Sequence, residues 1–109
     1  EAFVVRINQD SLVGYCSWRL IEGELYLNNL AIHPEHRRQG LARLLLMHLT
    51  QDATSRGVRS IMLEVRSSNA AALKLYGRMG FKRVGRRPDY YTNPVEDAVL
   101  LSKSLVQNC

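Results

Sequence analysis

Apolar and polar residues alternate along the first third of the chain in the manner of β-strands. Residues 3–7, 12–20 and 25–32 are rich in β-branched and aromatic side chains, and short polar turns separate them. The first two segments predict an antiparallel hairpin. The third predicts another strand, which Pro34 helps to end because proline has no backbone N–H to donate.

The spacing of apolar residues changes to that of a helix in the middle of the chain. Residues 41–56 and 70–79 predict two helices, with Gly57 as the C-terminal cap of the first and Asn69 as the N-cap of the second. A short apolar strand at residues 61–65 lies between them. The apolar stripe expected on the first helix consists of Leu41, Leu44, Leu45, Leu49 and Ala53.

Two further strands are predicted at residues 81–87 and 97–104, around a loop that contains Pro88 and Pro94. The order strand, strand, strand, helix, strand, helix, strand, strand predicts an α/β fold, a sheet with flanking helices in a single domain over residues 1–109. Its central strand–helix–strand unit predicts a right-handed parallel crossover.

The charge of the chain favours acidic ligands. The formal net charge is +5, and 12 of the 15 basic residues are arginine, which suits a phosphorylated cofactor or nucleic acid. Nucleic acid is disfavoured because the chain has neither an RNA-binding aromatic signature nor Cys/His zinc spacing. Cys16 and Cys109 show no disulfide or metal spacing, which predicts a reducing, cytoplasmic setting without a metal. No apolar stretch approaches the roughly 18 residues of a membrane span.

The sequence Arg-Arg-Gln-Gly-Leu-Ala at residues 37–42 stands where a loop enters the first predicted helix. The first turn of a helix presents backbone N–H groups without intrahelical partners, and its dipole favours anions. Gly40 and Ala42 would let a phosphate oxygen approach the backbone closely. This pattern predicts an anion site, and the alternative is an ordinary solvated helix start.

A carboxylate interrupts the apolar strand at residues 61–65. Glu64 follows Ile61-Met62-Leu63 in a strand expected to be buried on both faces, so its charge needs a partner or a function. One interpretation is a general base in a cleft at the carboxyl end of the strand. The alternatives are a salt bridge to Arg66 or another arginine, or a strand end that emerges into water.

The second predicted helix can present a partner for Glu64. Asn69, Ala72, Leu73 and Tyr76 fall on one stripe over two helical turns, and that stripe can look into the same cleft. The alternatives are that Tyr76 is a core aromatic residue and that Asn69 serves only as a cap.

Several segments in this order resemble the GNAT acetyltransferase superfamily. Residues 37–42 are similar to its pyrophosphate-binding motif, usually written Gln/Arg-x-x-Gly-x-Gly/Ala. Residues 63–76, Gly80-Phe81, Arg87-Pro88-Asp89-Tyr90-Tyr91 and Glu96-Asp97-Ala98 resemble a narrower branch, the RimI-type ribosomal-protein-alanine N-acetyltransferases. The resemblance implies a GNAT-like mixed sheet. Because that family normally begins with a strand and two helices, we expect the sequence to be incomplete at its front.

The resemblance also implies a role for individual residues. Glu64 would accept a proton, through water, from the incoming amine, and Tyr76 would protonate the departing thiolate of acetyl-CoA. The residues that would bind acetyl-CoA are Leu30, Ala31, Ile32, Arg37, Arg38, Gln39, Gly40, Leu41, Ala42, Arg43 and Asn69.

The implied acceptor is the N terminus of a protein. Tyr90 and Tyr91 resemble residues that frame the acceptor peptide, the alternative being an exposed aromatic loop. The resemblance implies N-α-acetylation of an N-terminal alanine on a ribosomal protein. The alternatives are acetylation of a lysine or small-molecule amine, and a CoA-binding module without turnover.

Overall fold

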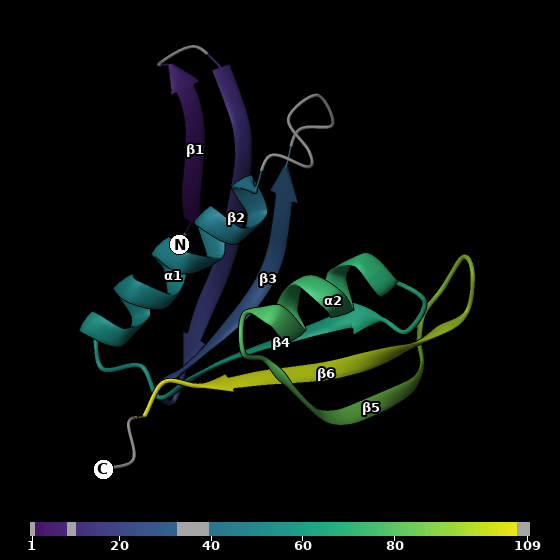
Figure 1. Ribbon diagram of the computed structural model, residues 1–109. Helices are drawn as coiled ribbons and strands as arrows, with labels where there is room; N and C mark the ends of the chain where they lie inside the picture. The colour runs from purple at the N-terminus through teal and green to yellow at the C-terminus, as the bar shows by residue number, and fades with distance from the viewer. Residues whose placement is uncertain (1, 9–10, 33–39, 107–109) are drawn as a thin grey trace.

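The computed structural model describes residues 2–8, 11–32 and 40–106, which form one mixed sheet with two helices (Figure 1). The elements are β1 (Ala2–Asn8), β2 (Ser11–Ile21), β3 (Glu24–Ile32), α1 (Leu41–Ser55), β4 (Ser60–Arg66), α2 (Ala70–Arg78), β5 (Lys82–Tyr91) and β6 (Glu96–Ser104). The order of elements along the chain is the predicted one. The spatial order of the strands is β1-β2-β3-β4-β6-β5.

The sheet has one parallel pair, β3 with β4, among the strands that the structure describes. This confirms the parallel geometry predicted for the unit β3-α1-β4. The pairing joins Glu24–Tyr26 to Ser60–Met62, and beyond it the two strands diverge, as Figure 1 shows. The carboxyl-terminal halves of β3 and β4 therefore open a gap within the sheet, the place where α/β sheets commonly bind ligands.

Helix α1 buries a stripe that differs in part from the predicted one. Leu45, Leu46, Leu49 and Ala53 are buried, whereas Leu44 is 43% exposed. The prediction was wrong to include Leu44 and to omit Leu46. Helix α1 turns the side that carries Leu45 and Leu46 toward the strands. Leu44 precedes Leu45 by one residue, which is a rotation of about 100° around the helix axis, so its side chain points away from the strands.

Shortening the side chain of Leu49, which has no exposed surface, should strongly destabilise the packing of α1 against the core. Leu49→Ala removes buried methyl groups and leaves a cavity, so we expect a loss of about 2–5 kcal/mol in the free energy of unfolding. Leu44→Ala on the same helix is the matched control and should cost well under about 1 kcal/mol. Urea unfolding followed by circular dichroism measures both. Equal losses in the two variants would contradict this packing.

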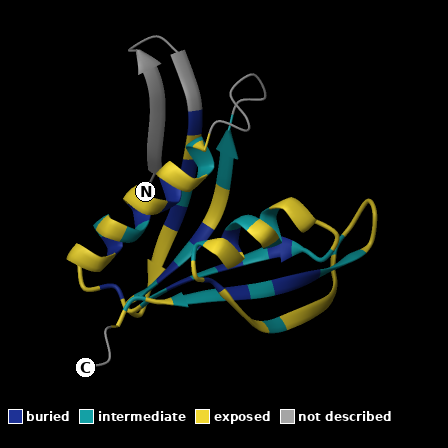
Figure 2. Cartoon of the chain, in the orientation of Figure 1, coloured by how far each residue is buried: buried dark blue, intermediate teal, exposed yellow. Residues whose placement is uncertain are grey.

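Strand β4 is buried on one face only. Ile61, Leu63 and Val65 pack into the core on the side of the helices, while Met62, Glu64 and Arg66 alternate with them on the opposite face and are half-buried (Figure 2). The expectation that β4 is buried on both faces was therefore wrong. Both helices lie on one side of the sheet in Figure 1, so no described helix covers the other side.

Strand β5 extends further than predicted. It continues past Arg87 through Pro88 to Tyr91, where the sequence suggested a loop. Proline is tolerated here because β5 is an edge strand and has a ladder on one side only. The register shifts between Arg87 and Tyr91, and Asp89 adopts a left-handed φ of 51°. Tyr90 and Tyr91 thus end a strand, which fixes their positions against β4.

Candidate functional site

The gap between β3 and β4 forms a hollow of about 560 Å³ on the side of the helices. Backbone and side chains from β3, β4, the first turn of α1 and the start of α2 line it. Residues from all three predicted groups meet there. Those lining the hollow are Leu30, Ala31, Ile32, Ala42, Glu64, Asn69, Tyr76 and Tyr91.

The start of α1 has the features of an anion site. Gly40 precedes the helix with a left-handed φ of 74°, a conformation that glycine adopts without strain. The first turn carries no acidic residue, so the N–H groups of Leu41, Ala42 and Arg43 face no carboxylate of that turn. Arg37, Arg38 and Gln39, which were also predicted to bind the cofactor, lie outside the described residues.

Asn69, at the start of α2, both caps the helix and lines the hollow. Its Oδ1 accepts a hydrogen bond from the Ala72 N–H at 3.1 Å, which confirms the predicted N-cap. Asn69 also lines the hollow. The capping bond uses only Oδ1, so the Nδ2 group can still donate to a ligand.

Tyr76 likewise is both a core residue and part of the hollow. It is 7% exposed and packs edge-to-face on Phe81, with the ring centroids 5.3 Å apart. Burial, together with the nearby Cys16, raises the pKa of the Tyr76 hydroxyl to about 12. The hydroxyl therefore stays protonated at neutral pH and can act as a proton donor.

Glu64 lies on β4, and its side chain reaches across the neighbouring strand β6 to a residue of β5. Its Oε1 pairs with the Arg87 Nε at 3.0 Å, and its side chain is 25% exposed. The Tyr90 hydroxyl donates a hydrogen bond to the same carboxylate. The predicted alternative of a salt bridge is thus confirmed with Arg87. Arg66, the partner named first from the sequence, binds Glu96 instead.

A second hollow of about 240 Å³ lies on the opposite face of the sheet. Arg19, Tyr26 and Tyr90 contribute to its lining. The two hollows share a wall made of Leu27, Asn28, Leu63, Glu64 and Tyr91. Glu64 is therefore accessible from both faces of the sheet through the gap between β3 and β4.

Sequence reasoning missed Arg19, Tyr26, Asn28 and Arg87 as site residues. The pair Asn28-Asn29 inside an apolar strand was a usable signal, and the structure shows the reason for it. The register of β2 with β3 pairs Ser17 with Asn29 and then Trp18 with Leu27, so Asn28 is an extra residue. Such bulges bend a strand and commonly occur beside functional sites.

The two tyrosines at the end of β5 are held by arginines. Arg66 stacks over the Tyr91 ring at 4.3 Å, Arg87 lies 5.6 Å from the Tyr90 ring centroid, and the two rings contact edge-to-face at 5.0 Å. Burial, and then the Glu64 charge, raise the pKa of Tyr91, while the hydrogen bond to Glu64 raises that of Tyr90. Tyr90 and Tyr91 thus contact each other and the charged side chains around Glu64, with Tyr90 still 49% exposed.

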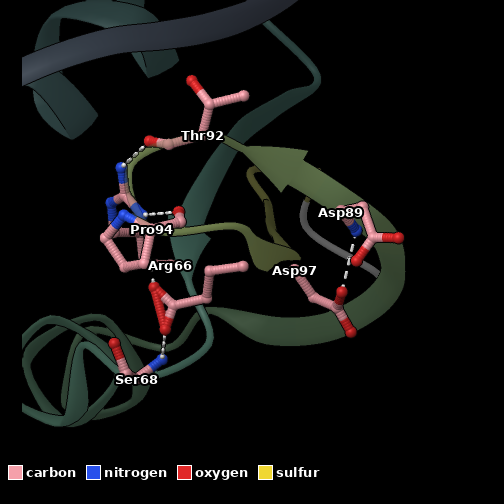
Figure 3. A network of polar contacts seen from close by, with 7 residues as sticks. Arg66, Ser68, Asp89, Thr92, Pro94 and Asp97 are labelled. Carbon is pink, nitrogen blue, oxygen red and sulfur yellow. Dashed lines mark hydrogen bonds and ion pairs between the residues drawn. The ribbon is translucent and has the colours of Figure 1, made fainter.

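A polar network fixes the turn that carries these tyrosines (Figure 3). Arg66 donates to the backbone carbonyls of Thr92 at 3.4 Å and Pro94 at 3.3 Å, and pairs with Glu96. The other oxygen of Glu96 accepts from the Ser68 N–H at 3.1 Å. The network thus ties the β4–α2 connection to the turn between β5 and β6.

The neighbouring Asp97 fixes the irregular part of β5. Its Oδ1 accepts from the Asp89 N–H at 2.8 Å, as Figure 3 shows, and its Oδ2 pairs with the Arg86 Nε at 2.6 Å. These bonds satisfy the backbone at the register shift and hold Tyr90 at the mouth of the second hollow.

Acid should weaken this network. Hydrogen bonds, first from Ser68 and then from Arg66, lower the pKa of Glu96 below 4.5, and the Asp89 N–H and Arg86 lower that of Asp97 below 3.8. A carboxyl with a lowered folded pKa stabilises the protein above its unfolded pKa, and that contribution is lost as the pH falls through the folded value. We expect the Tm to fall steeply below about pH 4.

The measurement is thermal unfolding between about pH 7 and pH 3. Glu96→Gln/Asp97→Asn should have a lower Tm at neutral pH and a flatter decline in acid than the wild type. Glu22→Gln, in the exposed β2–β3 turn, is the control and should follow the wild-type curve. Parallel curves for the wild type and the double variant would contradict the role of the network.

Comparison with known proteins identifies the family to which the chain belongs. The family model described as "Acetyltransferase (GNAT) family" matches residues 1–81, most of the chain. The chain belongs to the GNAT acetyltransferase family. This result agrees with the glycine of the motif Gln/Arg-x-x-Gly-x-Gly/Ala, which stands directly before α1.

Relatives of this GNAT chain carry related names. It is 40% identical over 93 residues to the [ribosomal protein bS18]-alanine N-acetyltransferase of Escherichia coli (strain K12), covering 84% of the chain and 63% of that relative. The chain therefore spans less than two thirds of the length of this protein. The crystal structure of the ribosomal-protein-S18-alanine N-acetyltransferase from Escherichia coli matches with a TM-score of 0.86 and 36% identity, over 94% of this chain and 67% of that one.

A second similar structure contains a peptide. A chain of the NatC complex, in a crystal structure bound to Gag peptide and CoA, matches with a TM-score of 0.82 and 29% identity, over 94% of this chain and 69% of that one.

Two further observations on this GNAT chain concern metal-binding side chains and membrane-spanning helices. Over residues 14–32 and 40–106, whose side chains the structure describes, no three His, Cys, Asp or Glu side chains gather as a metal site would require. Neither α1 nor α2 combines the length and the hydropathy needed to cross a bilayer.

Proposed function

We propose that this chain carries out acetyl-CoA-dependent N-α-acetylation of a protein that begins with alanine, a ribosomal protein in the first instance. The observation that carries the proposal is that Glu64 and Tyr76 line one hollow at the gap between β3 and β4. One can accept a proton and the other can donate one. The names of the Escherichia coli relatives support the choice of acceptor.

The donor, acetyl-CoA, fits the hollow on the side of the helices. Beyond Tyr26 the backbone of β3 has left β4, so Leu30, Ala31 and Ile32 can bind an amide-containing arm along an open strand edge. The start of α1 offers N–H groups and the dipole to a pyrophosphate. Residues 37–43 would surround that pyrophosphate, and Asn69 would bind the donor from the start of α2.

The reaction needs an amine, a thioester and two proton transfers. The acceptor nitrogen attacks the thioester carbonyl, and Glu64 accepts a proton from that nitrogen through water. The carbon–sulfur bond breaks as the tetrahedral intermediate collapses, and Tyr76 gives its proton to the departing thiolate. The raised pKa of Tyr76, about 12, keeps that proton in place until it is needed. Backbone N–H groups at the edge of β3 can stabilise the oxyanion.

The acceptor fits the smaller hollow on the other face. Tyr90 and Tyr91 stand at its rim and would frame the first residues of a peptide, with Glu64 in the shared wall. An α-amine has an ordinary pKa of about 8, against about 10.4 for lysine, so it loses its proton more readily near neutrality. This difference favours a free N terminus over a lysine as acceptor.

Mass spectrometry of acetyl transfer tests the proposal. The substrates are an alanine-starting peptide and the same peptide with its α-amine blocked and a lysine left free, each incubated with acetyl-CoA and the chain. We expect acetylation of the free N terminus only. Modification of the lysine peptide alone, or retained acetyl-CoA binding without any product, would overturn it in favour of lysine acetylation or of a binding module.

A further inference from the structure

Charged groups surround the Glu64 carboxylate on the face where the acceptor is placed. Arg87 and Tyr90 from β5 contact it directly. Tyr91 is close enough for the Glu64 charge to act on it, and Arg66 stacks over Tyr91 and pairs with Glu96. Among the residues that the structure describes, the remaining titratable groups lining the two hollows are Arg19, Tyr26 and Tyr76. Within this described set, the three arginines Arg19, Arg66 and Arg87 outnumber the two carboxylates Glu64 and Glu96 by one positive charge.

An excess of positive charge is unusual for a site that receives an amine, because at neutral pH an α-amine is mostly a positively charged ammonium ion. An unpaired carboxylate would attract that ammonium and favour its protonated form. The protonated form has no lone pair and cannot attack a thioester. A cation beside the carboxylate has the opposite effect, since a like charge within about 4–6 Å disfavours the ammonium form.

We propose that Arg87 is a positioning residue that neutralises Glu64 so that the acceptor binds as the neutral amine, which selects an α-amine over a lysine. This inference rests on the proposed function and adds a determinant of specificity to it. The ion pair of 3.0 Å keeps the guanidinium on the carboxylate, and the Tyr90 ring, which lines the smaller hollow, lies 5.6 Å from the guanidinium carbon. Glu64 remains able to accept the proton that the nitrogen loses on attack.

Solvent limits the size of the effect. The Arg87 side chain is 55% exposed, so its charge is partly screened. We therefore expect a change at the lower end of the range for neighbouring charges, a shift of about one pH unit in the protonation of the bound amine.

Proton release on peptide binding tests this without turnover. Isothermal titration calorimetry at about pH 7, in two buffers of different ionisation enthalpy, counts the protons released when an alanine-starting peptide with no other charge binds. The free α-amine has an ordinary pKa of about 8, and a shift of about one unit brings it to about 7 in the complex, so binding at pH 7 releases about 0.4 of a proton. We expect that release in the wild type and in Arg87→Lys, and its loss in Arg87→Met.

Arg83→Met is the matched control, since Arg83 is an exposed arginine of the same strand. It should release protons like the wild type. Equal release in Arg87→Met and Arg83→Met would overturn the role of Arg87, as would loss of release in Arg87→Lys, because that variant keeps the charge. Absence of any peptide binding to the wild type would instead overturn the proposed function itself.

Kinetics give a second readout. In Arg87→Met the rise of kcat with pH should move about one unit upward, without a matching rise in KM for the acceptor. A merely structural role for Arg87 would raise KM and leave the profile in place.

Discussion

Replacing Glu64 with glutamine lowers kcat for acetylation of an alanine-starting peptide by about 100-fold or more, the usual contribution of a positioned general base. The amide keeps the shape of the side chain but cannot accept the proton that leaves the acceptor nitrogen. The Kd for acetyl-CoA should change by less than about twofold, because the donor is held by β3 and the helix starts. Steady-state kinetics and calorimetry with acetyl-CoA measure the two quantities.

The change also removes the negative partner of Arg87, so a control must separate chemistry from structure. Glu64→Asp keeps the charge and moves it by one methylene, and it should retain more activity than Glu64→Gln. Glu22→Gln, in the exposed β2–β3 turn, should behave as the wild type. Wild-type turnover in Glu64→Gln would show that another group, or the solvent alone, accepts the proton.

Replacing Tyr76 with phenylalanine should lower kcat by about 100-fold, because the departing thiolate loses its proton donor. The edge-to-face contact with Phe81 survives the change, so the fold and acetyl-CoA binding should persist. The wild-type rate should show no alkaline loss from this donor below about pH 11, since the pKa of Tyr76 is raised to about 12.

Acyl donors with more acidic thiols give the sharpest readout. A more acidic thiol leaves without help, so the rate difference between the wild type and Tyr76→Phe should shrink as the acidity of the thiol rises. Tyr15→Phe, on an exposed tyrosine of β2, is the matched control and should match the wild type with every donor. A constant ratio across donors would mean that Tyr76 packs the site without donating a proton.

Local pattern was enough to predict the order of the elements, both helices and the Asn69 cap. These features depend on periodicity and on the first turn of a helix, which neighbouring residues determine. Leu44 and Leu46 show the limit of that reasoning. Both belong to a nearly continuous leucine run, and only the direction in which α1 meets the strands decides which of them is buried.

The register of the strands explains why the ion-pair partner of Glu64 was predicted only as Arg66 or another arginine. Glu64 and Arg66 share a face of β4 two residues apart, which favoured Arg66 from the sequence. The pairing of β4 with β6 and of β6 with β5 places both Arg66 and Arg87 opposite Ala98. Arg87 thereby comes within reach of Glu64, through strand pairings that a single sequence does not reveal. The same pairings carry β5 past Pro88, where local rules predict a loop.

The early end of the β3–β4 pairing has a consequence for inhibitor design. A molecule that occupies both hollows must pass through the sheet, between strands that are hydrogen-bonded only a few residues away. The passage is bordered by Asn28, Leu63 and Glu64, which all belong to the strands β3 and β4 rather than to loops. A tethered donor–acceptor mimic for this site would therefore need a thin, unbranched linker at its centre, with bulk tolerated only at the two ends.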